Sequence, residues 1–197
     1  MMKTRPWFML ILTITLLVLG ACTAAPAAVT ATAVPATVMP ATATAEACPS
    51  PTAGAALLTN AEDGYCLLYP AAYSTTIPDY IVINAYSAPG DIPGDSWVWI
   101  DTQDAAGLTA VEAAEAEIME AGPGFNITRT DVTVNGEEAV VVDGIPAQDS
   151  MRRVFIVHNN RLYRLSFMPW LPNGGGTAQP ALEELYSMIL DTMHFLP

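Results

Sequence analysis

The hydrophobic positions in the first part of the folded region predict short strands. Residues Tyr65–Tyr69 form an apolar run that ends at Pro70, which lacks the N–H group that a central strand needs. Residues 80–86 (YIVINAY) are rich in β-branched and aromatic side chains, and residues 97–100 (WVWI) follow a turn-rich stretch. We therefore expect a strand at each of these three places.

The hydrophobic period then changes to that of a helix. Thr109 and Glu112 have the spacing of a capping box, in which each residue binds the backbone N–H of the other. The pattern predicts a helix that ends at Gly122, with its apolar stripe at Val111, Ala114, Ile118 and Ala121. Thr177 is the candidate cap of a last helix, whose stripe is Leu182, Leu185, Tyr186, Ile189 and Met193.

Two β-hairpins are predicted between these helices. Asn135-Gly136 would join strands at 126–134 and 137–143, because both residues tolerate the positive φ of a tight turn. Asn159-Asn160 would join 152–158 to 161–168, which pairs residue 158 with 161 and residue 154 with 165.

This register divides the side chains of the second hairpin between two faces. One face carries Val154, Ile156, Tyr163, Leu165 and Phe167. The other carries Phe155, Val157 and Leu162 beside Arg153 and Arg164. Apolar groups on both faces predict a central hairpin that is covered on each side. We therefore expect an α+β fold in which an antiparallel β-sheet is flanked by two helices.

The N-terminal residues have the pattern of a secretory signal peptide. Lys3 and Arg5 precede an apolar run at 7–19, which is shorter than the roughly 20 residues of a membrane-spanning helix. The run leads into Leu19-Gly20-Ala21-Cys22, which resembles the lipobox of bacterial lipoproteins. This resemblance implies cleavage before Cys22, diacylglycerol on its thiol, and acylation of the new N-terminus with a chain such as palmitate. An ordinary signal peptide beside a chance cysteine is the alternative.

The chain is predicted to consist of a signal peptide (1–21), a disordered tether (22–52) and a single folded domain (53–197). The tether is almost entirely Ala, Thr, Pro, Val and Ser, and Glu46 is its only charged residue. Such a segment cannot bury enough apolar surface to offset the entropy of ordering. Its repeated prolines favour extended conformations, so it would act as a spacer.

The net negative charge of the chain restricts the classes of partner that it can bind. Loss of the signal peptide would remove Lys3, the chain's one lysine, together with Arg5. Five arginines would then remain against 20 acidic residues. Because nucleic acids repel so acidic a chain, we expect no nucleic-acid partner. With the lipobox, the sequence predicts a protein anchored by lipid at the extracytoplasmic face of the cell membrane.

Two cysteines remain once Cys22 is assigned to lipid. Cys48 and Cys66 can form a disulfide in an oxidising compartment, and the bridge would join the end of the tether to the first strand. Two free thiols are the alternative.

The order of these elements resembles the PsbP-like superfamily. The resemblance rests on Gly64-Tyr65-Cys66-Leu67-Leu68-Tyr69-Pro70, the two hairpin turns with Arg161-Leu162-Tyr163, and the ending Met193-His194-Phe195. It implies an α/β/α sandwich around an antiparallel sheet, and a group made largely of adaptors and assembly factors without catalysis. The layout is also similar to that of uncharacterised bacterial envelope lipoproteins. No functional residue of the superfamily can be matched to a position here.

Candidate metal ligands occur in and after the turn-rich segment 87–95. Hard cations such as Ca²⁺ bind several carboxylate oxygens, but the spacing matches no EF-hand, and solvated turn residues explain the acidic side chains equally well. The candidates are Asp91, Asp95, Asp101 and Asp104.

No cofactor motif is present: Gly174-Gly175-Gly176 lacks the lysine of a phosphate loop, and no serine lies in a nucleophile elbow. We therefore expect no cofactor.

Candidate binding residues lie on the second hairpin. Arg153 and Arg164 share a face and could grip a carboxylate or phosphate of a ligand or partner. Trp170, in an apolar loop just beyond the hairpin, could extend this surface. The alternatives are that the arginines balance the protein's own carboxylates and that Trp170 folds over the core.

Two hypotheses about function follow. The first is a lipid-anchored, non-catalytic module that binds a protein or a small ligand in the cell envelope. The second is an anchored hydrolase or metal-dependent enzyme that uses the acidic region 91–104.

Overall fold

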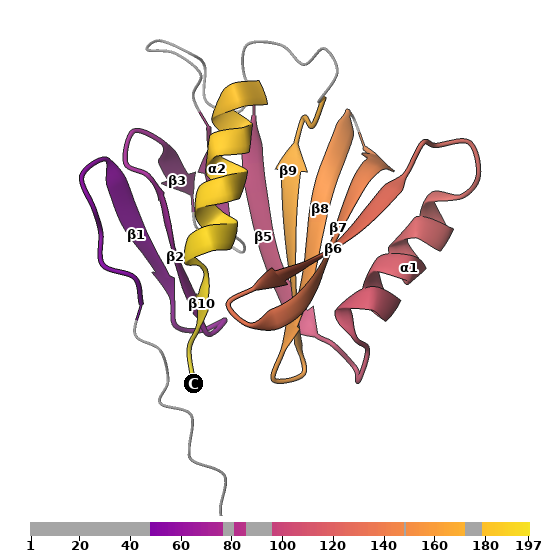
Figure 1. Cartoon of the computed structure of the whole chain (residues 1–197), viewed down its shortest axis with the longest axis horizontal. Coiled ribbons are helices and arrows are strands. Elements are labelled where there is room, and N and C mark those ends of the chain that lie inside the picture. Colours follow the sequence, from indigo (N-terminus) through magenta and orange to yellow (C-terminus); the bar gives the residue numbers. More distant parts are fainter. Residues whose placement is uncertain (1–47, 77–80, 86–95, 148, 172–178) are drawn as a thin grey trace, which may run out of the picture. The chain divides into compact units, whose positions relative to one another are not determined.

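The computed structural model describes residues 48–76, 81–85, 96–147, 149–171 and 179–197. The chain divides into the units Met1–Thr42 and Ala43–Pro197, and all described residues belong to the second unit. They form antiparallel β-sheets and two α-helices (Figure 1), which confirms the predicted α+β class. Neither of these helices combines the length and the hydropathy needed to cross a membrane. The predicted signal peptide, most of the predicted tether and Thr177 lie outside the described residues.

The larger sheet has the strand order β3-β4-β5-β9-β8-β7-β6. Both predicted hairpins are present with the predicted register, because Val134 pairs with Glu137 and His158 pairs with Arg161. The strands are β3 (Ser74–Thr76), β4 (Ile81–Asn84), β5 (Trp97–Asp104), β6 (Thr128–Val134), β7 (Glu137–Pro146), β8 (Ser150–His158) and β9 (Arg161–Met168). The prediction for 97–100 was too short, since β5 pairs with β9 as far as Asp104.

The smaller sheet has the order β1-β2-β10. Its strands are β1 (Ala55–Asn60), β2 (Tyr65–Pro70) and β10 (His194–Phe195). The prediction at Tyr65–Tyr69 corresponds to β2, whereas β1, β3 and β10 were not predicted. Within β1 only Leu58 is buried, so the sequence of this strand has little hydrophobic alternation. The segment is a strand because it pairs with β2 along its whole length.

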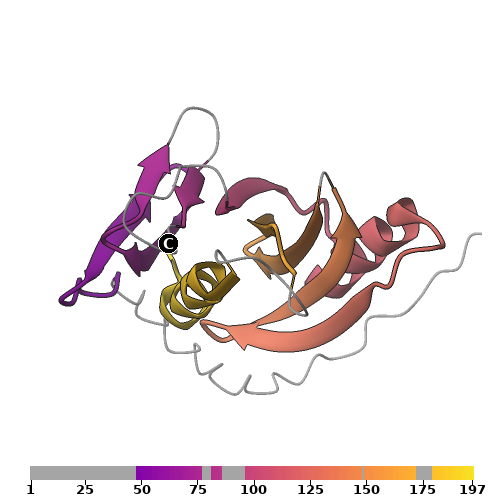
Figure 2. The ribbon, with the colours of Figure 1, turned by 90° about the horizontal axis from the view of Figure 1, so that it is seen from above.

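The two helices cover opposite faces of the larger sheet (Figure 2). Helix α2 (Gln179–Thr192) contributes Leu182, Leu185 and Ile189 to the main core, together with Val154, Ile156, Leu165 and Phe167 of the sheet. Helix α1 (Ala110–Ala121) packs on the other face against Val140, Val142, Phe155 and Leu162. The predicted division of the second hairpin between two faces is therefore confirmed.

Candidate functional site: the open edge of strand β6

The β6–β7 hairpin is fixed at both ends by residues with positive φ. Asn135 and Gly136 have φ values of 49° and 84°, which form the predicted two-residue turn. At the other end, Gly144 has a φ of 85° where the register between β7 and β8 shifts. A Cβ atom at this position would lie 2.4 Å from the carbonyl oxygen of Asn126, so the close approach of the two segments requires glycine.

Strand β6 is one edge of the larger sheet, and β7 is its one pairing partner within the described part of the chain. Most of its residues are exposed. Val134 and Glu137 exchange backbone hydrogen bonds across the turn, and bonded pairs alternate along an antiparallel ladder. Arg129, Asp131 and Thr133 therefore direct their backbone N–H and C=O groups away from β7, toward the open side.

Helix α1 begins with the predicted capping box, which the structure confirms. The hydroxyl oxygen of Thr109 accepts a hydrogen bond from the backbone N–H of Glu112 at 3.2 Å. The carboxylate of Glu112 accepts one from the backbone N–H of Thr109 at 2.9 Å. The hydrogen bonds from Thr109, above all that from its backbone, lower the pKa of the Glu112 carboxyl.

Two ion pairs attach α1 to the sheet. Arg129 of β6 lies 3.0 Å from Glu115, and Arg153 of β8 pairs with Glu117. The buried residues of α1 are the small side chains Ala110, Ala113 and Ala114. The helix therefore has few large apolar contacts of its own, and charge contributes to its attachment.

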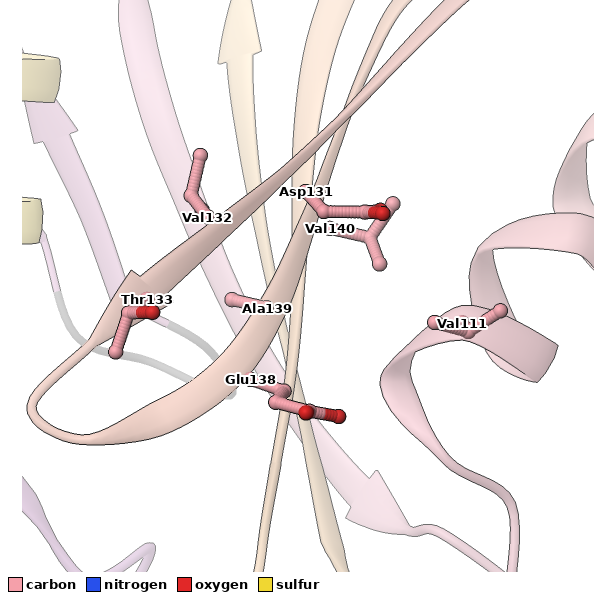
Figure 3. Close-up of a pocket in the computed structure, with 7 residues that line it drawn as sticks. All are labelled: Val111, Asp131, Val132, Thr133, Glu138, Ala139 and Val140. Atoms are coloured by element: carbon pink, nitrogen blue, oxygen red, sulfur yellow. The ribbon is translucent and has the colours of Figure 1, made fainter.

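A pocket of about 300 Å³ lies between the first turn of α1 and the β6–β7 hairpin (Figure 3). It is lined by Val111, Asp131, Val132, Thr133, Glu138, Ala139 and Val140. In Figure 3, the side chains of Asp131, Glu138 and Val140 point toward α1 and Val111. The pocket thus opens directly beside the open edge of β6.

The pocket combines apolar and acidic side chains. The carboxylate of Asp131 accepts hydrogen bonds from Nε and Nη2 of Arg129 at 3.0 and 2.8 Å, and its side chain is 70% exposed. Glu138 lies opposite Thr133 and is a diagonal neighbour of Asp131 on the same face. Apolar walls below a carboxylate rim suit a group with an aliphatic stem and a cationic end.

The arginines that were predicted as an anion-binding pair share a face of the β8–β9 hairpin, and each contacts a carboxylate of this chain. Arg153 pairs with Glu117, and its Nε donates to the hydroxyl of Ser166 at 2.9 Å. Nε and Nη2 of Arg164 donate to one carboxylate oxygen of Asp101 at 2.9 and 2.5 Å. These contacts correspond to the alternative in which the arginines balance the protein's own charge.

Trp170 contacts Arg152, which is not one of the two arginines predicted to bind an anion. Trp170 itself is 3% exposed and belongs to the main core, and the guanidinium carbon of Arg152 lies 3.8 Å from the ring centroid. Arg152 also binds both carboxylate oxygens of Asp143, at 2.6 and 2.7 Å. Because neighbouring residues of a strand face opposite ways, Arg152 and Trp170 are on the other face from Arg153. The predicted set of Arg153, Arg164 and Trp170 is not brought together.

Two of the four candidate metal ligands are described, whereas Asp91 and Asp95 lie outside the described residues. Asp101 is paired with Arg164. The Oδ1 atom of Asp104 accepts hydrogen bonds from the side chain of Asn160 and the backbone of Ala106, at 2.8 and 2.7 Å. In residues 48–197, apart from the segments that are not described, no three His, Cys, Asp or Glu residues are grouped to hold a metal ion.

Cys48 and Cys66 form a disulfide, with their Cα atoms 5.8 Å apart. Cys66 is fully buried in β2, the central strand of the smaller sheet. Residues 48–52, which were predicted to end the tether, are therefore attached covalently to the folded unit. Cys22 lies outside the described residues.

The sequence did not identify the residues of the pocket as a site, and Val111 was predicted only as part of the apolar stripe of its helix. The alternation of Thr with charged residues in TRTDVTV (128–134) is typical of a solvated edge strand and was the available signal. The position of β6 in the sheet and the placement of Val111 opposite Glu138 depend on tertiary packing, which no local pattern encodes.

The chain matches no model of a known protein family and no curated protein. Its structure is similar to the solution structure of cyanobacterial PsbP from Synechocystis sp. PCC 6803, with 11% sequence identity, a TM-score of 0.47, and coverage of 76% of this chain and 98% of that chain. It is also similar to a protein of unknown function from Pseudomonas aeruginosa, with 18% identity, a TM-score of 0.36, and coverage of 57% and 81%. Both similarities concern the fold alone.

Proposed function

We propose that this protein is a non-catalytic binding module of the bacterial cell envelope, held at the extracytoplasmic face of the membrane by lipid on Cys22. The lipobox and the Thr/Ala/Pro-rich spacer support the anchor. The open edge of β6 beside the pocket supports the binding role and is the observation that carries the proposal. The ligand is an extended segment of another envelope protein.

The backbone of β6 supports this mode of binding. An extended peptide can add a strand to an open sheet edge, where backbone hydrogen bonds supply affinity and side-chain pockets supply specificity. The outward groups of Arg129, Asp131 and Thr133 offer such bonds. Edge strands are often protected by charged side chains, but here Arg129 contacts Glu115 and Asp131 of its own chain, so its charge is partly neutralised.

The binding role is tested by removing one outward N–H group. Thr133→Pro removes a donor that faces the open side, and proline is tolerated in an edge strand when its position faces outward. Thr133→Ala is the matched control, because it keeps the N–H group. The full chain with a C-terminal affinity tag is cross-linked in intact cells, and the captured envelope proteins are identified by mass spectrometry.

We expect an envelope protein that is captured by the native chain and by Thr133→Ala but lost with Thr133→Pro. Circular dichroism of the purified variants verifies that both remain folded. Capture that is identical for all three chains would contradict binding at β6.

The anchor is tested separately. Cys22→Ala removes the thiol that would carry the lipid. The protein should then move from the membrane fraction to the soluble fraction, because two or more acyl chains are needed for stable anchoring. Mass spectrometry of the native N-terminal peptide should show the added lipid. An unmodified Cys22 thiol would rule out the anchor and leave the binding role to its own test.

A further inference from the structure

The register of β6 determines which side of an added strand would face the pocket. Arg129, Asp131 and Thr133 point to the α1 face, where the pocket opens, whereas Val132 packs against the core on the other face. A strand added antiparallel to β6 would lie about 4.8 Å away. Its residue opposite Thr133 would be aligned with Thr133 and with Glu138 of β7, which pairs directly with Thr133.

The chemistry of the pocket favours a lysine at this position. An extended lysine side chain is long enough to pass over Thr133 toward Glu138, on the face where Val111 of α1 lines the pocket (Figure 3). Asp131 already shares its charge with Arg129. Among the residues that the structure describes, no cation lies within 4 Å of the Glu138 carboxylate. A compact ammonium group can contact both carboxylates without requiring the planar geometry of a second guanidinium.

The cation cannot come from the folded part of this chain. Lys3, in the predicted signal peptide, is its one lysine, and the predicted tether carries a single charge, at Glu46. The five arginines beyond residue 22 each contact a carboxylate of their own chain: Arg129, Arg152, Arg153, Arg161 and Arg164. A second copy or the tether would therefore bring no spare positive charge to the pocket.

We propose that the segment bound at β6 belongs to another protein and places a lysine opposite Thr133, with its ammonium group between Asp131 and Glu138. The residues on either side of this lysine face Val132 and are β-branched. This inference rests on the proposed function, since it names the sequence that the β6 edge selects.

Defined peptides test the inference. The probe is a fluorescein-labelled peptide of about nine residues that alternates threonine and valine around a central lysine, Thr-Val-Thr-Val-Lys-Val-Thr-Val-Thr. Two further peptides replace the lysine with glutamate or norleucine. Binding to the full chain in detergent is measured by fluorescence polarisation. The lysine peptide should bind about tenfold more tightly than the glutamate peptide, and the difference should shrink as salt is added.

Charge variants connect this preference with the pocket. Glu138→Lys should reverse the preference, so that the glutamate peptide binds more tightly than the lysine peptide. Glu120→Lys is the matched control, because it makes the same change in net charge at an exposed position near the far end of α1. The control should retain at least half of the native preference for lysine. A preference that Glu138→Lys and Glu120→Lys alter equally would overturn the proposal.

The peptides also separate this inference from the proposed function. Equal affinity for all three peptides, with binding still abolished by Thr133→Pro, would overturn the lysine preference and leave edge binding in place. Failure of every peptide to bind would overturn the inference. The proposed function fails too if the cross-linking experiment captures no envelope protein in a manner that depends on Thr133. Binding of the lysine peptide that survives Thr133→Pro would contradict both.

Discussion

The two faces of the larger sheet are covered in different ways. On the α2 face, large side chains such as Phe167 and Leu185 interlock with the sheet in the main core. On the α1 face, the buried side chains of the helix are alanines, Ile118 is half-buried, and ion pairs from Arg129 and Arg153 contribute to the attachment. The pocket lies on this second face. The comparison indicates that the α2 face supplies most of the stability, while the lighter packing on the α1 face leaves the pocket open beside β6 and β7.

The α2 face is reinforced further by the smaller sheet. The hydroxyl oxygen of Thr192 accepts a hydrogen bond from the backbone N–H of Leu68 at 2.9 Å, and the buried Tyr65 and Leu67 of β2 join the main core. The backbone N–H of Leu196 also donates to the carbonyl of Gly64 at 2.8 Å. The C-terminal helix is therefore held between two sheets, whereas α1 rests on one.

Truncation of a core residue on each face should give the largest difference. Leu185→Ala removes a fully buried side chain of α2 and should lower the free energy of unfolding by about 2–5 kcal/mol. Ile118→Ala on α1, which is half-buried, should cost about 1 kcal/mol. Urea unfolding of both variants measures the two losses. Equal losses would show that the faces do not differ in the proposed way.

Removal of the disulfide should have the next largest effect, on the α2 side. The variant with Cys48→Ala and Cys66→Ala opens a loop with a sequence separation of 18 and should lose about 3 kcal/mol of stability. Peptide affinity at β6 should stay the same, because the bridge lies in the smaller sheet. Chemical denaturation and fluorescence polarisation are compared for the native chain and this variant. A large loss of affinity in chains that remain folded would contradict the independence of the two regions.

Disruption of one ion pair should weaken the α1 face by a smaller amount. Arg153→Met leaves the Glu117 carboxylate, whose side chain is 20% exposed, without this partner and should cost about 1–2 kcal/mol. Adding Glu117→Gln should recover part of the loss, since no unpaired charge then remains. A double-mutant cycle by urea unfolding measures the coupling between the residues. Strictly additive losses would mean that this pair does not hold the helix.

The capping box should give the smallest effect, one that depends on pH. The pKa of Glu112 is lowered in the folded state, so its contribution is present above the ordinary value of 4.5 and is lost as the pH falls through the folded value. Glu112→Gln should therefore lower the Tm at neutral pH, and its difference from the native chain should shrink as the pH falls below 4.5. A Tm difference between the two chains that grows on acidification would contradict a stabilising role for the ionised Glu112 carboxylate.

The elements with strong local signals could be predicted from the sequence. The Asn135-Gly136 turn sets the register of β6 against β7 without any tertiary information, because the loop length and the positive φ values allow few arrangements. Thr109 and Glu112 marked the start of α1 because the capping box that they form depends only on two residues three positions apart. The alternation of Val154 and Phe155 between two faces then implied a helix on each side of the sheet.

Features that depend on distant partners could not be predicted. His194 and Phe195 form β10 because Cys66 and Tyr65 lie beside them in space, and two residues carry no periodicity of their own. Trp170 and Arg152 meet across the end of the sheet, whereas their sequence positions suggested a site with Arg153. The pocket depends likewise on how closely the alanines let α1 approach β7.

The bridge between Cys48 and Cys66 determines how a mechanical load would enter the fold. Tension that arrives from the N-terminal side of Cys48 passes through the sulfur atoms into β2 and bypasses β1 and the turn that follows it. The load thus enters at the middle strand of a sheet, between β1 and β10, and β1 lies outside its path.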